Sequence, residues 1–513
     1  MKINIIEYLE QTVRTNPDKT AVIAGERSIT FSELINHAKF LALEIRNAEY
    51  SLNRPIAVYL PKSIESIIAD FAITYSGNCY MNLDIKSPVS RTSNIIGLVD
   101  PVIIVTNSAY IETAGEINSA SVILNIDTII SLDKFYVIDE TEIATYRNTI
   151  IDTDPYCIIN TSGSTGTPKS VVLNNKSFID FTEWAIETLQ ISDNEIVGSL
   201  SPLVFDIYSF ELCMLASKSS TLVLIPENLA AFPFNMLKLI SLTEVSFIFW
   251  VPTIMVNIAN MDLLSKIELP LLRTVWFAGE VFPTKQFNYW KYHLRNSKFV
   301  NLYGPIEITL DCTYFIVDRE LKDDEPIPIG FPCRNTDILI LNENNTLTAI
   351  NEEGELCIRG TSLAMGYYNN PKKTAAAFVQ NPLNNSYPET IYRTGDIVYR
   401  NSSGEIMFKG RKDSLIKHLG YRIELGEIEH VIINSLKLVE NGCVVYNTAK
   451  KEITLFYVSG KDITVADMKK SIGQALPKYM IPTVFFKMEE LPRNTNGKID
   501  RLFLNKKVNY DQN

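Results

Sequence analysis

The residues best suited to bind a polyphosphate lie in one short segment, Asn160–Lys169, with the sequence NTSGSTGTPK. Two glycines allow tight turns that expose backbone N–H groups, three hydroxyl side chains add donors, and a lysine adds positive charge. These residues are Gly163, Gly166, Ser162, Ser164, Thr165 and Lys169. The spacing is not that of a Walker A loop, which would need glycine at position 168, where this chain has proline. The segment therefore predicts a different kind of phosphate loop, following the strand-like run YCII.

Eight further motifs accompany this loop in a fixed order along the chain. They are ITFSEL (29–34), GNCYMNLDIKSPVSR (77–91), FDIYSFEL (205–212), NLYGPIE (301–307), GELCIRG (354–360), YRTGD (392–396), GRKDSLIKHLGYRIELGEIE (410–429) and NTNGKIDR (494–501). With the loop, they resemble the adenylate-forming superfamily, which contains acyl-CoA synthetases, luciferases and the adenylation domains of non-ribosomal peptide synthetases. The resemblance covers almost the whole chain. Within the superfamily, the sequence is most similar to stand-alone amino-acid adenylating enzymes, including D-alanine–carrier-protein ligases.

The resemblance implies ATP and Mg²⁺ as cofactors and assigns a nucleotide site. Its ATP-binding residues are Thr161, Ser162, Gly163, Ser164, Thr165, Gly166, Lys169, Gly279, Glu280, Asn301, Tyr303, Gly304, Asp396, Arg411 and Lys498. Asp396 is expected to accept hydrogen bonds from the ribose hydroxyls, a task that suits a carboxylate. Tyr303 is expected to stack on adenine. Glu307 is the expected ligand of Mg²⁺, a cation that prefers oxygen ligands.

The catalytic residues implied by the resemblance are Lys498, Glu307 and Thr165. In this chemistry the substrate carboxylate attacks the α-phosphorus of ATP and pyrophosphate leaves, so a positioned lysine stabilises the negative charge on the phosphate oxygens. Asp413 stands where the family's C-terminal domain pivots. We expect this rotation to withdraw Lys498 after adenylation and to open a path for the thiol.

The acyl substrate is expected to be an amino acid because Asp206 stands where amino-acid-activating members keep an aspartate for the substrate ammonium. The alternative is a helix N-cap aspartate. By motif alignment the substrate pocket consists of Asp206, Ile207, Phe210, Phe249, Trp276, Ala278, Leu302, Leu310 and Asp311. The bulky side chains suggest a small or tightly held substrate, and Asp311 either meets a polar group of the substrate or points away.

One position departs from the family pattern. The threonine of the NLYGPTE-type motif, which contacts the α-phosphate, is Ile306 in this chain. Its loss removes one hydroxyl donor, worth roughly 0.5–1.5 kcal/mol, and Thr309 or a water is the expected substitute. The chain stops soon after Lys498, so we expect the acceptor thiol on a separate phosphopantetheinylated carrier protein, or on coenzyme A. The alternatives are an acyl-CoA synthetase acting on a non-amino acid and a degenerate adenylate-binding scaffold.

The elements that must position these residues alternate between short β-branched strands and helices, which predicts α/β sheets. Strands are expected at 55–60, 102–106, 221–225, 246–250, 273–277 and 298–303. From about residue 338 the pattern changes to strands and turns, which resembles a small β-barrel section. A compact α+β segment follows, with helices at 424–434 and 465–476. The expected fold is therefore an α/β multidomain enzyme, with an adenylation core at 1–412 and a small mobile C-terminal domain at 413–513.

Composition excludes several other classes of protein. The chain has 513 residues, too many for one hydrophobic core. Its net charge of -11 argues against nucleic acid or an anionic membrane as a partner. The seven cysteines are scattered singly, which fits neither a disulfide framework nor a zinc site. The N-terminus is typical of an amphipathic helix rather than a signal peptide, and we expect a cytoplasmic location.

Overall fold

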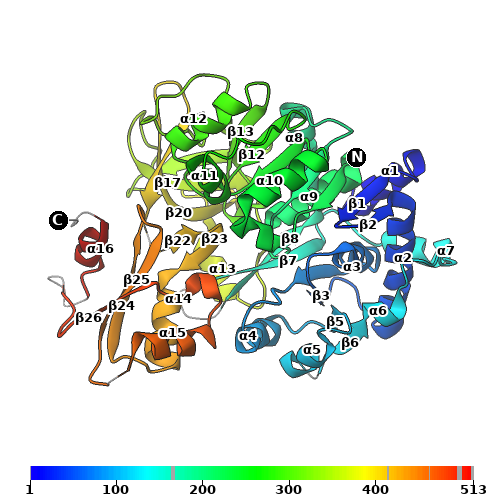
Figure 1. The fold of residues 1–513 in the computed structure, drawn as a ribbon, viewed down its shortest axis with the longest axis horizontal. Coiled ribbons are helices and arrows are strands. Elements are labelled where there is room, and N and C mark those ends of the chain that lie inside the picture. The colour runs from blue at the N-terminus through cyan, green and yellow to red at the C-terminus, as the bar shows by residue number, and fades with distance from the viewer. Residues whose placement is uncertain are drawn as a thin grey trace. The chain divides into compact units, whose positions relative to one another are not determined.

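The computed structural model describes residues 2–118, 120–162, 168–412, 415–461, 463–493 and 499–509. These residues fall in two compact units (Figure 1). The first contains Met1–Ile85, Val99–Ile159 and Val171–Gly410, and the second contains Lys86–Leu98, Asn160–Ser170 and Arg411–Asn513. The α/β multidomain fold class expected from the sequence is confirmed. The boundary between residues 412 and 413 stays a prediction.

The first unit is built on a nine-stranded sheet whose central strands are parallel. Its order is β15 (Phe331–Pro332), β14 (Thr313–Ile316), β13 (Lys298–Tyr303), β12 (Thr274–Phe277), β11 (Phe247–Trp250), β9 (Ile196–Ser199), β10 (Thr221–Leu224), β1 (Thr20–Ala24) and β2 (Arg27–Thr30). Side chains alternate between its two faces, as the pleat requires. Phe247 and Phe249 pack in one hydrophobic cluster, whereas Ile248 and Trp250 pack in another.

Helices cover both faces of this sheet, which explains why its strands are apolar throughout. The cluster of Phe249 includes α8 (Asn175–Leu189) and α9 (Asp206–Lys218), and the cluster of Trp250 includes α10 (Pro233–Leu242), α11 (Pro252–Asn260) and α12 (Thr284–His293). These helices can be followed in Figure 1. Phe210 of α9 packs against Phe249 of β11 and Trp276 of β12.

A seven-stranded sheet follows the order β18 (Gly366–Tyr367), β8 (Lys169–Asn174), β7 (Pro155–Thr161), β4 (Cys79–Asn82), β3 (Pro55–Tyr59), β5 (Ile103–Thr106) and β6 (Val122–Asn125). The helices of the first unit that precede β7 in the chain are α1 (Ile5–Thr15), α2 (Phe31–Ala48), α3 (Ile64–Tyr75), α5 (Ile111–Ile117), α6 (Ile126–Ile129) and α7 (Glu140–Arg147). Helix α4 (Val89–Val99) belongs, except for its last residue, to the second unit. Helix α2 begins with a complete capping box, in which Thr30 and Glu33 satisfy each other's backbone N–H groups. Helix α1 confirms the amphipathic N-terminal helix.

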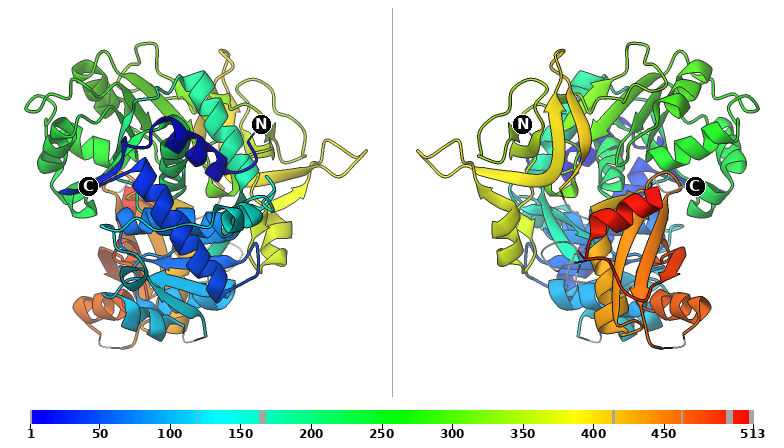
Figure 2. Two further views of the ribbon diagram at one scale, coloured as in Figure 1. Left: turned by 90° about the vertical axis from the view of Figure 1, so that its right-hand side faces the viewer. Right: turned by 90° about the vertical axis from the view of Figure 1, so that its left-hand side faces the viewer.

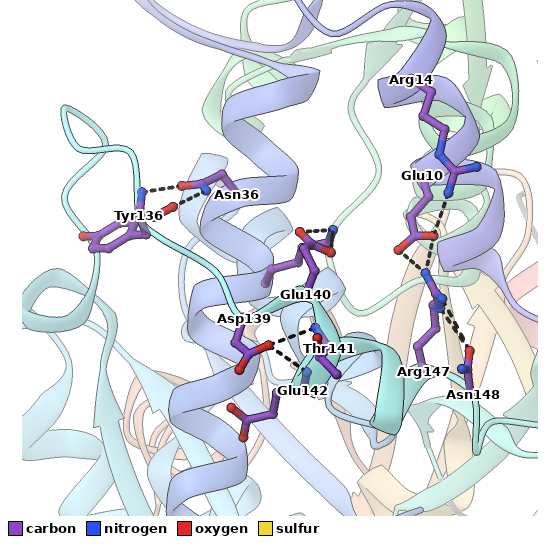
Figure 3. A network of polar contacts seen from close by, with 11 residues as sticks. Glu10, Arg14, Asn36, Tyr136, Asp139, Glu140, Thr141, Glu142, Arg147 and Asn148 are labelled. Atoms are coloured by element: carbon purple, nitrogen blue, oxygen red, sulfur yellow. Dashed lines mark hydrogen bonds and ion pairs between the residues drawn. The ribbon is translucent and has the colours of Figure 1, made fainter.

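A polar network fixes α7 to the N-terminal helices (Figure 3). Arg147 donates to both carboxylate oxygens of Glu10 at 2.6 and 2.7 Å, and Lys39 donates to both oxygens of Glu140 at 2.7 and 2.8 Å. Asn36 donates to the backbone oxygen of Tyr136 at 2.8 Å. Since α7 buries little apolar surface, these ion pairs and hydrogen bonds determine its position.

The β-rich section of the first unit is a five-stranded sheet. Its order is β16 (Thr336–Leu341), β17 (Gly354–Gly360), β20 (Thr390–Arg400) and β19 (Phe378–Gln380), and β21 (Ile406–Arg411) also pairs with β20. Helix α13 (Pro371–Ala377) precedes β19. The long strand β20 carries Asp396 and thereby brings the YRTGD motif against the end of β13.

The second unit contains the hairpin β22 (Leu415–His418) and β23 (Tyr421–Glu424) and a three-stranded sheet. The strands of that sheet are β24 (Asn441–Asn447), β25 (Glu452–Val458) and β26 (Val484–Lys487), and the helices are α14 (Leu425–His430), α15 (Val465–Gly473) and α16 (Arg501–Asn509). Figure 2 shows α16 beside these strands, where Leu504 packs with Cys443, Val445 and Phe456. The predicted helix at 424–434 is α14 continued by one π-helical turn, Val431–Ser435.

None of the helices formed by the described residues combines the length and the apolar character that a membrane crossing requires. All seven cysteines are buried.

Candidate functional site

The end of β13 brings together two residues that the sequence assigned to the nucleotide. The Tyr303 hydroxyl donates a hydrogen bond to Asp396 Oδ2, although the two residues are 93 positions apart. Tyr303 is 8% and Asp396 4% exposed. The backbone N–H of Asp396 donates to Thr394 Oγ1 at 2.9 Å, which fixes the carboxylate on β20. An acceptor-only group and an aromatic ring thus share one place in the first unit.

Asn301 lies two residues earlier on the same face of β13. Its side-chain amide donates to the backbone oxygen of Pro328 at 2.7 Å, so that its orientation is fixed. Together with Tyr303 it forms the part of the predicted nucleotide site that lies on β13.

The chain reverses sharply after Tyr303. A Cβ added at Gly304 would lie 2.1 Å from the backbone oxygen of Leu310, so no larger residue fits without movement of the backbone. Thr309 and Leu310 have φ of 51° and 65°, in the left-handed region that non-glycine residues rarely adopt. This strained turn places Leu310 and Asp311 against the start of the NLYGPIE motif.

Glu307 is completely buried in the short helix Ile306–Ile308 that precedes this turn. Its Oε1 accepts a hydrogen bond from the Tyr367 hydroxyl at 2.8 Å, and its backbone oxygen accepts one from the Ala364 N–H at 2.9 Å. The sequence did not identify Tyr367, which lies just before the helix PKKTAAA and outside the recognised motifs. No cluster of three or more His, Cys, Asp or Glu side chains suited to a metal occurs in the described ranges.

Gly279 and Glu280 follow β12 at the carboxyl edge of the sheet. Gly279 has a φ of 93°, and Glu280 Oε2 accepts hydrogen bonds from the hydroxyl and the backbone N–H of Thr253, the latter at 3.1 Å. The carboxylate therefore caps the first turn of α11, while Thr253 is a partner that the motifs did not reveal.

Asp206 is the first residue of α9, and Phe205 is its N-cap. The simple N-cap alternative therefore does not describe it. Asp206 Oδ1 accepts a hydrogen bond from the N–H of Ile207 at 2.9 Å. The helix start positions this carboxylate, only partly buried, next to the apolar residues of the predicted acyl pocket.

The predicted apolar pocket residues belong to one hydrophobic cluster of the first unit. They are Ile207, Phe210, Phe249, Trp276, Ala278, Leu302 and Leu310. Asp311, 4% exposed, follows directly after Leu310. Because Phe249, Trp276 and Leu302 come from the neighbouring strands β11, β12 and β13, the structure brings together residues that were assigned from separate motifs. Ile306 belongs to the same cluster, and the Thr309 hydroxyl is buried with no hydrogen-bond partner in the described part of the chain.

A buried charged pair beneath α9 was missed by the sequence reasoning. Lys62 Nζ lies 3.9 Å from Glu211 Oε2 and donates to the backbone oxygens of Ser199 and Ser201 at 3.0 and 2.6 Å. The Ser199 hydroxyl donates to the Glu211 carboxylate. Burial raises the pKa of Glu211 and lowers that of Lys62. Glu211 lies within FDIYSFEL, so a charged residue in an otherwise apolar helix was the available signal.

In the second unit, Ser162 and Lys169 contact the strand β23. The Ser162 hydroxyl donates to the backbone oxygen of Arg422 at 2.6 Å and accepts from the N–H of Glu424 at 3.0 Å. Lys169 Nζ forms an ion pair with Glu424 Oε1 at 2.6 Å. The Thr161 hydroxyl is buried with no hydrogen-bond partner within the described ranges.

Arg411 is the last residue of β21 and the first residue of the C-terminal segment of the second unit. Several predicted residues lie outside the described residues: Gly163, Ser164, Thr165, Gly166, Asp413 and Lys498. Their roles stay predictions.

The geometry defines a doubly wound α/β protein with a polar site at the carboxyl ends of its parallel strands, the place where ligands bind in such sheets. Residues 9–368 match the family described as AMP-binding enzyme. The chain therefore belongs to the AMP-binding enzyme family.

Two curated relatives show the extent of this similarity. The chain is 31% identical over 500 residues to Gramicidin S synthase 2 of Brevibacillus brevis, covering 97% of this chain and 11% of that protein. It is 30% identical over 504 residues to Zwittermicin A synthase ZmaJ of Bacillus cereus, covering 97% and 93%. The chain thus spans about a tenth of the gramicidin synthase but nearly the whole of ZmaJ.

Solved structures share the fold at lower identity. NpsA-ThdA, an artificially fused adenylation–PCP di-domain from Klebsiella oxytoca, has a TM-score of 0.80 and 21% identity, with 94% of each chain covered. A double mutant of o-succinylbenzoate CoA synthetase from Bacillus subtilis has a TM-score of 0.82 and 20% identity, with 98% of each chain covered.

Proposed function

We propose that this enzyme activates an amino acid as its aminoacyl adenylate and then transfers the aminoacyl group to the phosphopantetheine thiol of a carrier protein. The observation that carries the proposal is the position of Asp206. It begins α9 beside apolar side chains of the predicted pocket, so an ammonium group bound at this carboxylate would place the side chain of the substrate against apolar residues. A cationic partner also offsets the cost of a partly buried carboxylate.

The first half-reaction joins two substrates. One oxygen of the substrate carboxylate bonds to the α-phosphorus of ATP while the bond to the β-phosphate oxygen breaks, and pyrophosphate leaves. No general base is required, because the carboxylate is already a nucleophile. Tyr303 and Asp396 hold adenine and ribose, Asp206 holds the ammonium group, and Lys498, which lies outside the described residues, stabilises the phosphate charge.

Glu307 fits the proposed Mg²⁺ site. Its carboxylate is buried and already oriented by the Tyr367 hydroxyl, and Mg²⁺ is commonly held by one or two carboxylates together with substrate phosphates. Bound there, the ion would neutralise charge on the phosphates. In the second half-reaction the sulfur of the thiol bonds to the acyl carbon, the bond to AMP breaks, and the thiol proton is released.

Support for a carrier protein comes from the relatives. Most of the chain aligns with Gramicidin S synthase 2 and with Zwittermicin A synthase ZmaJ, and the fold is shared with an adenylation–PCP fusion. The fold is equally shared with a CoA synthetase, so the acceptor needs a direct test.

The test is ATP–pyrophosphate exchange over both enantiomers of the common amino acids and over simple fatty and aryl acids. We expect exchange with amino acids and its reduction by at least about tenfold in Asp206→Asn, since the variant loses a charge-assisted contact worth roughly 1.5–3 kcal/mol. Asp18→Asn, a change at an exposed aspartate of the same unit, is the control. Exchange with fatty or aryl acids alone would defeat the amino-acid assignment, whereas no exchange with any acid would favour a scaffold.

The acceptor is tested separately by presenting the preformed adenylate with a phosphopantetheinylated carrier protein or with coenzyme A. We expect a thioester on the carrier protein. Formation of the coenzyme A thioester alone would replace the carrier-protein assignment.

A further inference from the structure

Three aromatic rings form the inner end of the predicted acyl pocket. Phe210 stacks on Trp276 with ring centroids 5.6 Å apart, and Phe249 meets both rings edge-on at 6.2 and 5.7 Å. All three side chains are 0% exposed. A hollow large enough for a substrate side chain would leave ring atoms exposed on its side, so no such hollow adjoins these rings in the part of the chain that the structure describes.

The space behind the three rings is also filled. Phe181 of α8 packs edge-on against Phe210 at 5.3 Å, and Phe247 packs against Trp276 at 4.9 Å. Both are largely or fully buried. Because protein interiors are close-packed, the rings have no free volume into which they could retreat when a ligand enters.

The residues nearer the carboxyl edge of the sheet are slightly more exposed than these three rings. Ala278 follows Trp276 by two residues on the same face and is 4% exposed, and Ile207 of α9 is 6% exposed. Successive residues on one face of a strand are about 7 Å apart. Ala278 therefore lies nearer the carboxyl edge of the sheet than Trp276, and its methyl group fills less volume than an aromatic ring would.

We propose that Phe210, Phe249 and Trp276 act as the floor of the acyl pocket and restrict the substrate to α-amino acids with small side chains, of the size of glycine, alanine or serine. This inference rests on the proposed function, because it requires the substrate ammonium at Asp206. With the ammonium held there, the Cβ of the substrate lies at the level of Ala278, and a longer side chain would have to displace a close-packed ring.

The first experiment measures ATP–pyrophosphate exchange by the full chain with glycine, alanine, serine, valine, leucine and phenylalanine, in both enantiomers where they exist. We expect exchange with the best small amino acid to exceed that with leucine or phenylalanine by at least about tenfold, the discrimination expected when extra methylene groups do not fit. A preference for leucine or phenylalanine would overturn the inference and leave the proposed function intact. No exchange with any amino acid would defeat the proposed function itself, and the inference with it.

The second experiment replaces one of the three rings, Phe210, with a smaller side chain. Phe210→Leu should raise the ratio of leucine to alanine exchange by about tenfold or more. Phe277→Leu is the matched control, because Phe277 is equally buried on the opposite face of β12, in the other cluster. It should lower stability without changing the ratio. If Phe210→Leu remains folded by circular dichroism and leaves the ratio unchanged, or if both variants change it equally, these rings do not set the size of the substrate.

Discussion

Asp70 offers a sharp test of the buried electrostatics of the first unit. It lies inside the apolar helix α3 and is 1% exposed. Its Oδ2 accepts hydrogen bonds from the Tyr208 hydroxyl at 2.8 Å and from Asn82 Nδ2 at 3.2 Å, while its Oδ1 has no hydrogen-bond partner among the described residues. Burial raises the pKa of the Asp70 carboxyl from 3.8 to about 7, and the two hydrogen bonds only partly oppose this.

The sign of the effect on stability follows from the direction of this shift. Between pH 4 and pH 7 the folded protein keeps a proton on Asp70 that the unfolded chain has lost, so stability falls as the pH rises through this window. The two pH units from 5 to 7 correspond to about 3 kcal/mol. Above pH 7 both states have lost the proton, and the contribution of Asp70 becomes constant.

The perturbation is Asp70→Asn, which keeps the shape of the side chain but cannot ionise. As the pH rises from 5 to 8.5, the wild type should lose about 3 kcal/mol of its free energy of unfolding through Asp70, and the variant should not. The difference in stability between the variant and the wild type should therefore shift by about 3 kcal/mol in favour of the variant. Urea unfolding followed by tryptophan fluorescence measures this change. All four tryptophans lie in the first unit, so the signal reports the unit that contains Asp70.

Two further variants serve as controls for the titration of Asp70. Asp18→Asn at an exposed site should leave the pH dependence of the wild type unchanged. Tyr208→Phe removes a hydrogen bond that lowers the pKa of Asp70 and should extend the loss of stability to higher pH. If Asp70→Asn and the wild type have parallel stability curves from pH 5 to 8.5, the carboxyl is not held neutral by burial.

Three further predictions concern single side chains, each measured against the wild type. Lys62→Met should lower the free energy of unfolding by about 3–5 kcal/mol, measured in urea at pH 8, because it leaves Glu211 buried without its cation. Adding Glu211→Gln should recover part of this loss. Equal destabilisation of the single and double variants would contradict the pairing. Gly304→Ala should reduce ATP–pyrophosphate exchange by more than about tenfold, since its Cβ would collide with the Leu310 carbonyl, and unchanged exchange would show that this turn can move. Thr30→Ala should cost about 1 kcal/mol in the same urea assay by removing the cap of α2, and no change would show that the capping box is dispensable.

Local patterns in the sequence predicted the elements well where burial is strong. The strand expected at 298–303 is β13 with the same bounds, and those expected at 246–250 and 273–277 each begin one residue later. Continuous apolar runs between turn residues leave few alternatives for such strands. The helix expected at 465–476 ends instead at Gly473, because Pro477 disfavours helical geometry in the residue before it.

Contacts between side chains that are distant in sequence could be predicted only through the family resemblance, and some could not be predicted at all. The motifs assigned Tyr303 and Asp396 to one nucleotide, and the structure joins them. The pairing of Lys62 with Glu211 across 149 positions had no such guide, since no local pattern states which strand end faces which helix. A buried charge in an apolar helix indicates that a partner exists, but only the topology of the sheets identifies it.

The turn after Tyr303 shows why the position of the site is determined by the fold rather than by local preference. Thr309 and Leu310 both adopt left-handed φ, which costs of order 1–3 kcal/mol for each such residue. The surrounding structure offsets this cost by burying Ile308 and Leu310, which are 0% and 2% exposed. Since Gly304 lacks a Cβ, the strained segment can lie directly against the end of β13. The hydrophobic packing of these two residues therefore holds Glu307 in place, and at the proposed Mg²⁺ and phosphate site its charge would need little reorganisation on binding.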